Sequence, residues 1–302
     1  MMISNKGSVI GLLRWQQRSA FVMLVAATAA VIVHKIPALS WLVLPTTPLA
    51  VVGGAIGIFV SFRTNSAYDR WWEGRKLWGR LINTSRHWGS QVGAYLADTE
   101  ADAQIGPLVM RHVAYVHALR VLLRKQDPWV DAEFLDALSD EDRARIEGRS
   151  NLTHALLELQ LRELTVLNDA GTLANHRLES MDETLRHLLD IQGGCERIKK
   201  TPFPRGYSFI AERLILYFSC LFPFAIVAEL GWFTLPMNLL VCMAFLLISE
   251  VGRVLEDPFN MFFNGLPLSA ISRMIEVNLR EVLGQKEGLP PMRSPDHRGI
   301  LM

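Results

Sequence analysis

The stretch that decides the fold is residues 47–80, TPLAVVGGAIGIFVSFRTNSAYDRWWEGRKLWGR. Residues 49–62 carry no charge, whereas charged residues recur throughout 63–80 and no proline interrupts them. Thr47 suits an N-cap, and Pro48 suits the first helical position, where the missing N–H of proline costs nothing. We therefore predict one long helix that begins inside a bilayer and continues into the cytosol.

One face of this helix has a distinctive composition. Gly54, Ile58 and Phe62 are spaced by four residues, so they share a face. Small residues at this spacing are typical of a close contact between membrane helices. The same face could also line a pore, as a narrow apolar ring, if several copies surrounded an axis. Spacing alone leaves both interpretations open and favours the helix contact.

Composition limits the function classes. The chain has 302 residues, of which 50% are hydrophobic, with a mean hydropathy of +0.20 and a net charge of +1. This charge balance gives no indication of nucleic-acid binding, and we predict no nucleic-acid partner. The three cysteines, Cys195, Cys220 and Cys242, do not suggest a disulfide framework. The first apolar tract has no convincing cleavage site, so we interpret it as a retained anchor.

Three further apolar tracts complete a membrane pattern. They cover residues 19–33, 207–228 and 231–249, and together with the long helix they predict four membrane spans. Pro223, inside one of these tracts, predicts a kink or a break. The segment before the first span is basic, which places both termini and the middle of the chain in the cytosol. The middle, 63–206, shows helical periodicity and no alternating strand pattern, so the predicted fold class is all-α.

Catalytic and metal-binding patterns are absent from the sequence. There is no GxxxxGK[ST], GxGxxG, HExxH or GxSxG motif. His112 and His117 are five residues apart and are expected on different faces of their helix. The acidic pair Glu256–Asp257 is adjacent rather than facing, which is typical of a surface or helix end. We predict no enzyme, no cofactor and no metal site.

Three segments resemble those of the bacterial bestrophin homologues. They are SFRTNSAYDRWWEGRKLWG (61–79), GGCERIKKTPFPRGY (193–207) and LEDPFNMFFNGLPLSAISRMIEVNLREVLG (255–284). The resemblance implies a homopentameric ion channel in the bacterial inner membrane, with lipids and permeant monovalent ions as its other partners. It also implies that Gly54, Ile58 and Phe62 form an apolar neck on the fivefold axis. The expectation for this face therefore changes from helix contact to pore lining, because an apolar ring sheds water and opposes ion entry.

The sequence departs from the family pattern at three places. Gly54 stands where a bulky apolar residue is usual, which predicts a neck that is wider at its outer end. Counted back from Gly193–Gly194, the family's cytosolic aperture position falls on His176, where an apolar residue is usual. Five imidazoles there would change charge near neutral pH and favour anions in acid. The alternative is that this count is off by one or two residues and His176 is a surface residue of its helix. The eukaryotic members carry an acidic calcium-binding run, but the equivalent stretch here has only Glu256 and Asp257, too few oxygens for calcium.

The sequence thus predicts a bestrophin-like channel with a slight preference for anions such as chloride. The alternatives are a cation-selective channel of the same architecture, or a membrane scaffold or transporter that does not conduct. The predicted parts are an N-terminal segment with two spans (1–62), a helical cytosolic region (63–206), the third and fourth spans (207–253) and a cytosolic C-terminal segment (254–302).

Overall fold

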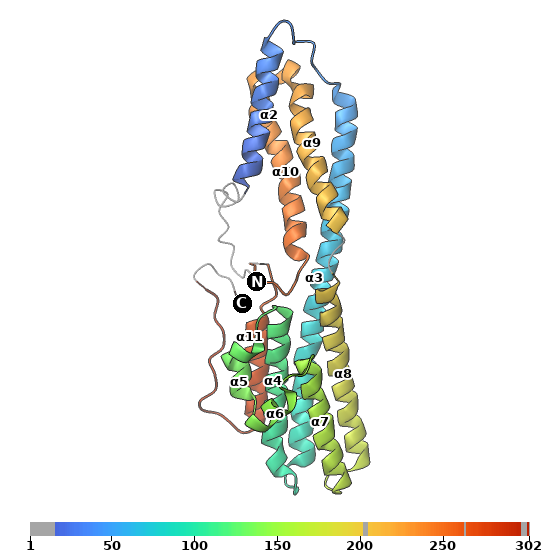
Figure 1. The fold of residues 1–302 in the computed structure, drawn as a ribbon, viewed down its shortest axis with the longest axis vertical. Helices are drawn as coiled ribbons and strands as arrows, with labels where there is room; N and C mark the ends of the chain where they lie inside the picture. Colours follow the sequence, from blue (N-terminus) through green and yellow to red (C-terminus); the bar gives the residue numbers. More distant parts are fainter. Residues whose placement is uncertain (1–15, 202–204, 263, 297–300, 302) are drawn as a thin grey trace. The chain divides into compact units, whose positions relative to one another are not determined.

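The computed structural model describes residues 16–201, 205–262, 264–296 and 301. Within these ranges the chain is helical and has no β-strand, which confirms the predicted all-α class (Figure 1). The α-helices are α2 (Gln17–Lys35), α3 (Thr46–Leu96), α4 (Ile105–Leu123), α5 (Ala132–Ala137), α6 (Asp140–Ile146), α7 (Leu152–Asp169), α8 (Asn175–Lys200), α9 (Arg205–Leu230), α10 (Thr234–Leu255) and α11 (Leu268–Val282).

The described residues form two compact units. The first, here called the apolar unit, includes residues 16–71 and 205–256; the second, here called the polar unit, includes residues 72–201 and the described residues of 257–301. Helix α3 contributes its first part to the apolar unit and its second part to the polar unit. Each unit is described below by itself.

Helices α2, α9 and α10 and the first part of α3 make up the apolar unit (Figure 1). Its core is apolar throughout and includes Ile56, Val60, Ile215 and Phe218. Among the described residues, three segments are long and apolar enough to cross a membrane: Gln17–Lys35, Thr46–Leu96 and Gly206–Leu255. The last of these contains both α9 and α10, joined by the 3₁₀ turn Gly231–Phe233.

Helix α3 agrees with the predicted long helix and exceeds it. It begins at Thr46 and continues without interruption to Leu96, because no proline follows Pro48 within it. In its second half the glycines allow a close neighbour rather than ending the helix. A Cβ at Gly89 would lie 2.8 Å from the side chain of Leu279, so only glycine permits this approach of α11.

Pro223 lies inside α9, and the helix continues through it to Leu230 instead of breaking. A proline inside a helix leaves the carbonyl four residues earlier without its usual donor. Here that carbonyl, on Ser219, accepts a hydrogen bond of 3.3 Å from the Asn238 side-chain amide. The same amide donates to the carbonyl of Met23 at 2.9 Å. Asn238 is fully buried and joins α2, α9 and α10.

The polar unit is arranged around α4. This helix packs against α5, α7, α8 and α11 and buries residues on all of its faces. Short capped helices follow it. Ser139 caps the start of α6, because its hydroxyl accepts a hydrogen bond of 3.1 Å from the backbone N–H of Asp142.

Candidate functional site

The predicted neck residues lie on a face of α3 that the chain itself leaves uncovered. Ile58 is 62% exposed and Phe62 is 68% exposed, as are other large apolar side chains of the apolar unit such as Leu240 at 68%. Gly54 is also exposed, and a Cβ built there would meet no atom within 4 Å. The three residues therefore form a continuous apolar stripe, here called the Gly54–Phe62 face.

A different side of the same helix makes the close contact with neighbouring helices. A Cβ at Gly53 would lie 3.1 Å from the ring of Phe218, and one at Gly57 would lie 3.4 Å from the ring of Phe245. Ile56 and Val60 are buried on this side. The two interpretations of the small residues thus fall on separate faces: Gly53 and Gly57 serve the helix contact, and the Gly54–Phe62 face remains available.

His176, the predicted aperture residue, belongs to the polar unit. It is the second residue of α8 and its side chain is exposed. The three neck residues belong to the apolar unit, so each part of the predicted site is placed within its own unit.

Arg63, which directly follows the Gly54–Phe62 face, corrects one sequence expectation. The onset of charge at Arg63 predicts that the water-facing half of the helix begins there, but the side chain of Arg63 is fully buried in the apolar unit. Its guanidinium group donates to Glu256 Oε1 at 2.7 Å and to the hydroxyl of Ser249 at 2.8 Å. A cation in so apolar a tract needs an acid within reach. Glu256, the first acid after α10 in the sequence, was the signal that could have identified its partner.

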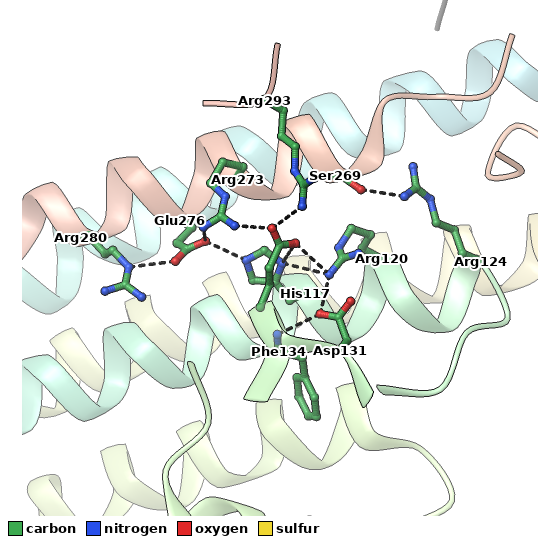
Figure 2. Close-up of polar contacts among 11 residues, drawn as sticks. His117, Arg120, Arg124, Asp131, Phe134, Ser269, Arg273, Glu276, Arg280 and Arg293 are labelled. Atoms are coloured by element: carbon green, nitrogen blue, oxygen red, sulfur yellow. Dashed lines mark hydrogen bonds and ion pairs between the residues drawn. The ribbon is translucent and has the colours of Figure 1, made fainter. Parts of the chain in front are cut away.

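A second buried charge network organises the polar unit (Figure 2). His117 is fully buried, and its Nε2 lies 3.0 Å from Glu276 Oε2 on α11. Its Nδ1 faces Glu133 Oε2 at 3.6 Å, and Arg120 contacts the same oxygen at 3.1 Å. Arg293, in the segment after α11, also pairs with Glu133 at 2.5 Å. The network therefore joins α4, α5, α11 and the segment that follows α11.

The two glutamates of this network are held in the ionised form. Burial opposes ionisation of Glu133, but the charge of His117, the hydrogen bond from Arg293 and the charge of Arg120 outweigh it, so its pKa lies below the usual value. Burial likewise opposes ionisation of Glu276, and the hydrogen bond and charge of His117 lead the groups that lower its pKa. The arrangement is that of a structural ion network, and the described residues hold no group of three or more potential metal ligands.

His112 lies on another side of α4, as expected from its spacing to His117. Its Nε2 is 2.9 Å from the Ser85 hydroxyl, and its ring stacks on Trp88 at 6.0 Å between centroids. Complete burial lowers the pKa of His112 to about 3, so this imidazole is neutral in the folded protein. Neither histidine is arranged as a catalytic base near an open cavity.

Comparison with known proteins finds relatives that match nearly the whole chain. A family model described as bacterial/fungal bestrophin protein matches residues 1–281. A voltage-dependent anion channel-forming protein of Ralstonia nicotianae is 34% identical over 289 residues, covering 94% of this chain and 92% of that protein. A protein of the same description from Escherichia coli K12 is 34% identical over 250 residues, covering 82% and 80%.

Solved structures give the same result for the fold. The crystal structure of a bacterial bestrophin homologue from Klebsiella pneumoniae matches with a TM-score of 0.82 and 33% identity, and it covers 88% of this chain and 97% of that one. The family model extends over the long helix with the Gly54–Phe62 face and over the segment around Glu256. The chain is therefore a member of the bacterial and fungal bestrophin family.

Proposed function

We propose that this protein is a homopentameric channel for small monovalent ions in the bacterial inner membrane. Four membrane helices per subunit would be α2, the first part of α3, α9 and α10, with both termini in the cytosol. The observation that supports the proposal most directly is the Gly54–Phe62 face. Its two large apolar side chains, Ile58 and Phe62, are not covered by the subunit. A ring of such faces around an axis forms a narrow hydrophobic neck, which an ion enters only by losing water.

Anions are the proposed permeant ions, with chloride as the simplest. Relatives over nearly the full chain carry the description of voltage-dependent anion channel-forming proteins. The exposed imidazole of His176 adds positive charge at the proposed aperture when it is protonated. The neck itself carries no charge and does not select by sign, so a cation-selective channel of the same architecture is the second candidate.

The test is current through the purified protein in a planar bilayer under a KCl gradient. We expect a single-channel current whose reversal potential lies on the chloride side. Phe62→Ala should raise the conductance or the open probability, because it removes part of the apolar barrier. Leu240→Ala is the matched control, since Leu240 on α10 is also 68% exposed, and it should leave the current unchanged.

Other outcomes would each change the proposal in a defined way. A reversal potential on the potassium side would show a cation channel. Absence of current in both the wild type and Phe62→Ala would show a membrane scaffold or transporter instead. If His176 lies at the aperture, the anion share of the current should rise in acid, and His176→Ala should abolish that rise.

A further inference from the structure

The first charged residue after the proposed neck in α3 is Arg63. It follows Phe62 directly in α3, and its side chain is fully buried. Arg63 makes three contacts on α10 and at its end: Glu256 Oε1 at 2.7 Å, the Ser249 hydroxyl at 2.8 Å and the Ser249 carbonyl at 3.4 Å. Arginine keeps its charge at any relevant pH, so this guanidinium group stays cationic within an apolar unit.

The surrounding helices bring Glu256 to this cation. A Cβ at Gly252 would lie 2.9 Å from the Thr64 hydroxyl, so glycine lets α10 approach α3 closely at this level. Glu256 directly follows α10, and Ser208 on α9 donates to the same carboxylate oxygen at 2.9 Å. The pair is thus fixed from three helices, and its net charge is zero.

Other charged groups near the pair contact atoms other than the Arg63 guanidinium group and the Glu256 carboxylate. Arg70 on α3 donates through Nε to the backbone carbonyl of Glu256 at 2.7 Å. Arg253 on α10 pairs with Glu250 on the same helix. Glu212 on α9 is a further acid that acts on Arg253. None of these groups replaces Glu256 as the partner of the buried Arg63 guanidinium.

We propose that the Arg63–Glu256 pair is a selectivity-determining element that keeps the neck electrically neutral. The inference rests on the proposed channel function. Because the neck residues carry no charge, the nearest unbalanced charge decides which ions are favoured there. An ion in the neck lies about one helix diameter, roughly 10 Å, from a side chain on the far side of α3. At an effective dielectric constant of about 20, one unbalanced unit charge at that distance changes ion occupancy roughly tenfold.

Two single variants should move selectivity in opposite directions. Glu256→Gln leaves Arg63 unbalanced in every subunit. Because this charge raises anion occupancy and lowers cation occupancy, each roughly tenfold, we expect the anion-to-cation permeability ratio to rise by at least about a hundredfold. Arg63→Gln leaves the carboxylate, and at alkaline pH the ratio should fall instead. The double variant Arg63→Gln/Glu256→Gln is neutral again and should return to the wild-type ratio. Glu183→Gln, at an exposed ion pair with Arg186 on α8, is the control for charge removal and should have no effect.

A pH series separates this role from a purely structural one. In Arg63→Gln the carboxylate of Glu256, whose side chain is 23% exposed, can take a proton in acid, so the shift toward cations should disappear as the pH falls. In Glu256→Gln the shift toward anions should persist, because arginine does not release its proton. In Arg63→Gln the remaining Glu256 carboxylate can become neutral by taking a proton, so this variant is the safer one for folding. If Glu256→Gln does not assemble, the pH dependence of the permeability ratio in Arg63→Gln alone tests the role of the pair.

The outcomes are distinct from those that test the proposed function. A wild type without current would contradict the channel proposal itself. A conducting wild type whose permeability ratio stays within about twofold in Arg63→Gln across the pH series would overturn the role of the pair and leave the channel proposal standing.

Discussion

The two units of this protein bury charge in different ways. In the apolar unit one cation, Arg63, meets one acid, Glu256, and the pair is neutral. In the polar unit arginines outnumber the acids around His117 (Figure 2), and the surplus is carried at the edge, where Arg293 is 47% exposed. Burial and the neighbouring Arg120 lower the pKa of Arg124 there to about 10, a sign of that surplus. A surplus of cations is thus accommodated where one of them, Arg293, lies at a water-exposed edge, whereas the fully buried Arg63 is matched by one acid.

The largest effect that tests this comparison should come from Glu276 in the polar unit. It is 4% exposed and contacts His117, Arg273 and Arg280. Glu276→Gln leaves His117 and the two arginines without their shared carboxylate, and we expect the free energy of unfolding of the full chain in detergent to fall by about 3 kcal/mol. Denaturant unfolding followed by circular dichroism measures it.

Glu183→Gln is again the control, because its partner Arg186 is exposed and such pairs contribute less than about 1 kcal/mol. Glu276→Gln should also leave the reversal potential unchanged, in contrast to Glu256→Gln. If the Glu276 variant were no less stable than the control variant, the network would not be a structural one.

A second, smaller effect should come from the neutral histidine of the polar unit. The unfolded chain binds a proton at His112 below about pH 6.5, whereas the folded chain does so only near pH 3. Stability therefore falls as the pH falls through this window, by about 1.4 kcal/mol per pH unit. Between pH 6.5 and pH 5 the wild type should lose about 2 kcal/mol through this group.

The variant His112→Gln can keep the hydrogen bond to Ser85 and has no proton to gain. Its stability should change less over the same interval, as measured by denaturant unfolding at several pH values. Identical pH slopes for the wild type and the variant would show that His112 does not remain neutral when folded.

The sequence was sufficient for most of the fold because the strongest signals are local. Hydrophobic tracts, Pro48 and the cap at Ser139 each specify a helix from nearby residues, and α3 agrees with its prediction because nothing in it stops a helix. The exposed state of Ile58 and Phe62 agrees with a lining role, although their lining of a pore stays a proposal.

The partners of the polar side chains could not be predicted in the same way. Arg63 and Glu256 are 193 positions apart, and His117 and Glu276 are 159 positions apart. Such contacts depend on tertiary packing, so a charge pattern read along the chain places Arg63 at the water boundary instead of in the core. Asn238 is a similar case, because its partner exists only where Pro223 leaves the Ser219 carbonyl without a donor.

The smallest expected effect is that of calcium. Carboxylate oxygens that an acidic calcium run would offer are engaged here by hydrogen-bond donors: Arg63 and the Ser208 hydroxyl hold Glu256, and Lys199 contacts Asp257 at 2.6 Å. Calcium requires six or more oxygens and would have to displace these partners. We expect millimolar calcium to leave the channel current unchanged relative to a chelator, and a reversible change in open probability would contradict this. Arg63→Gln sharpens the test: it frees one carboxylate without completing a calcium site, so the variant should become cation-selective at alkaline pH and still not respond to calcium.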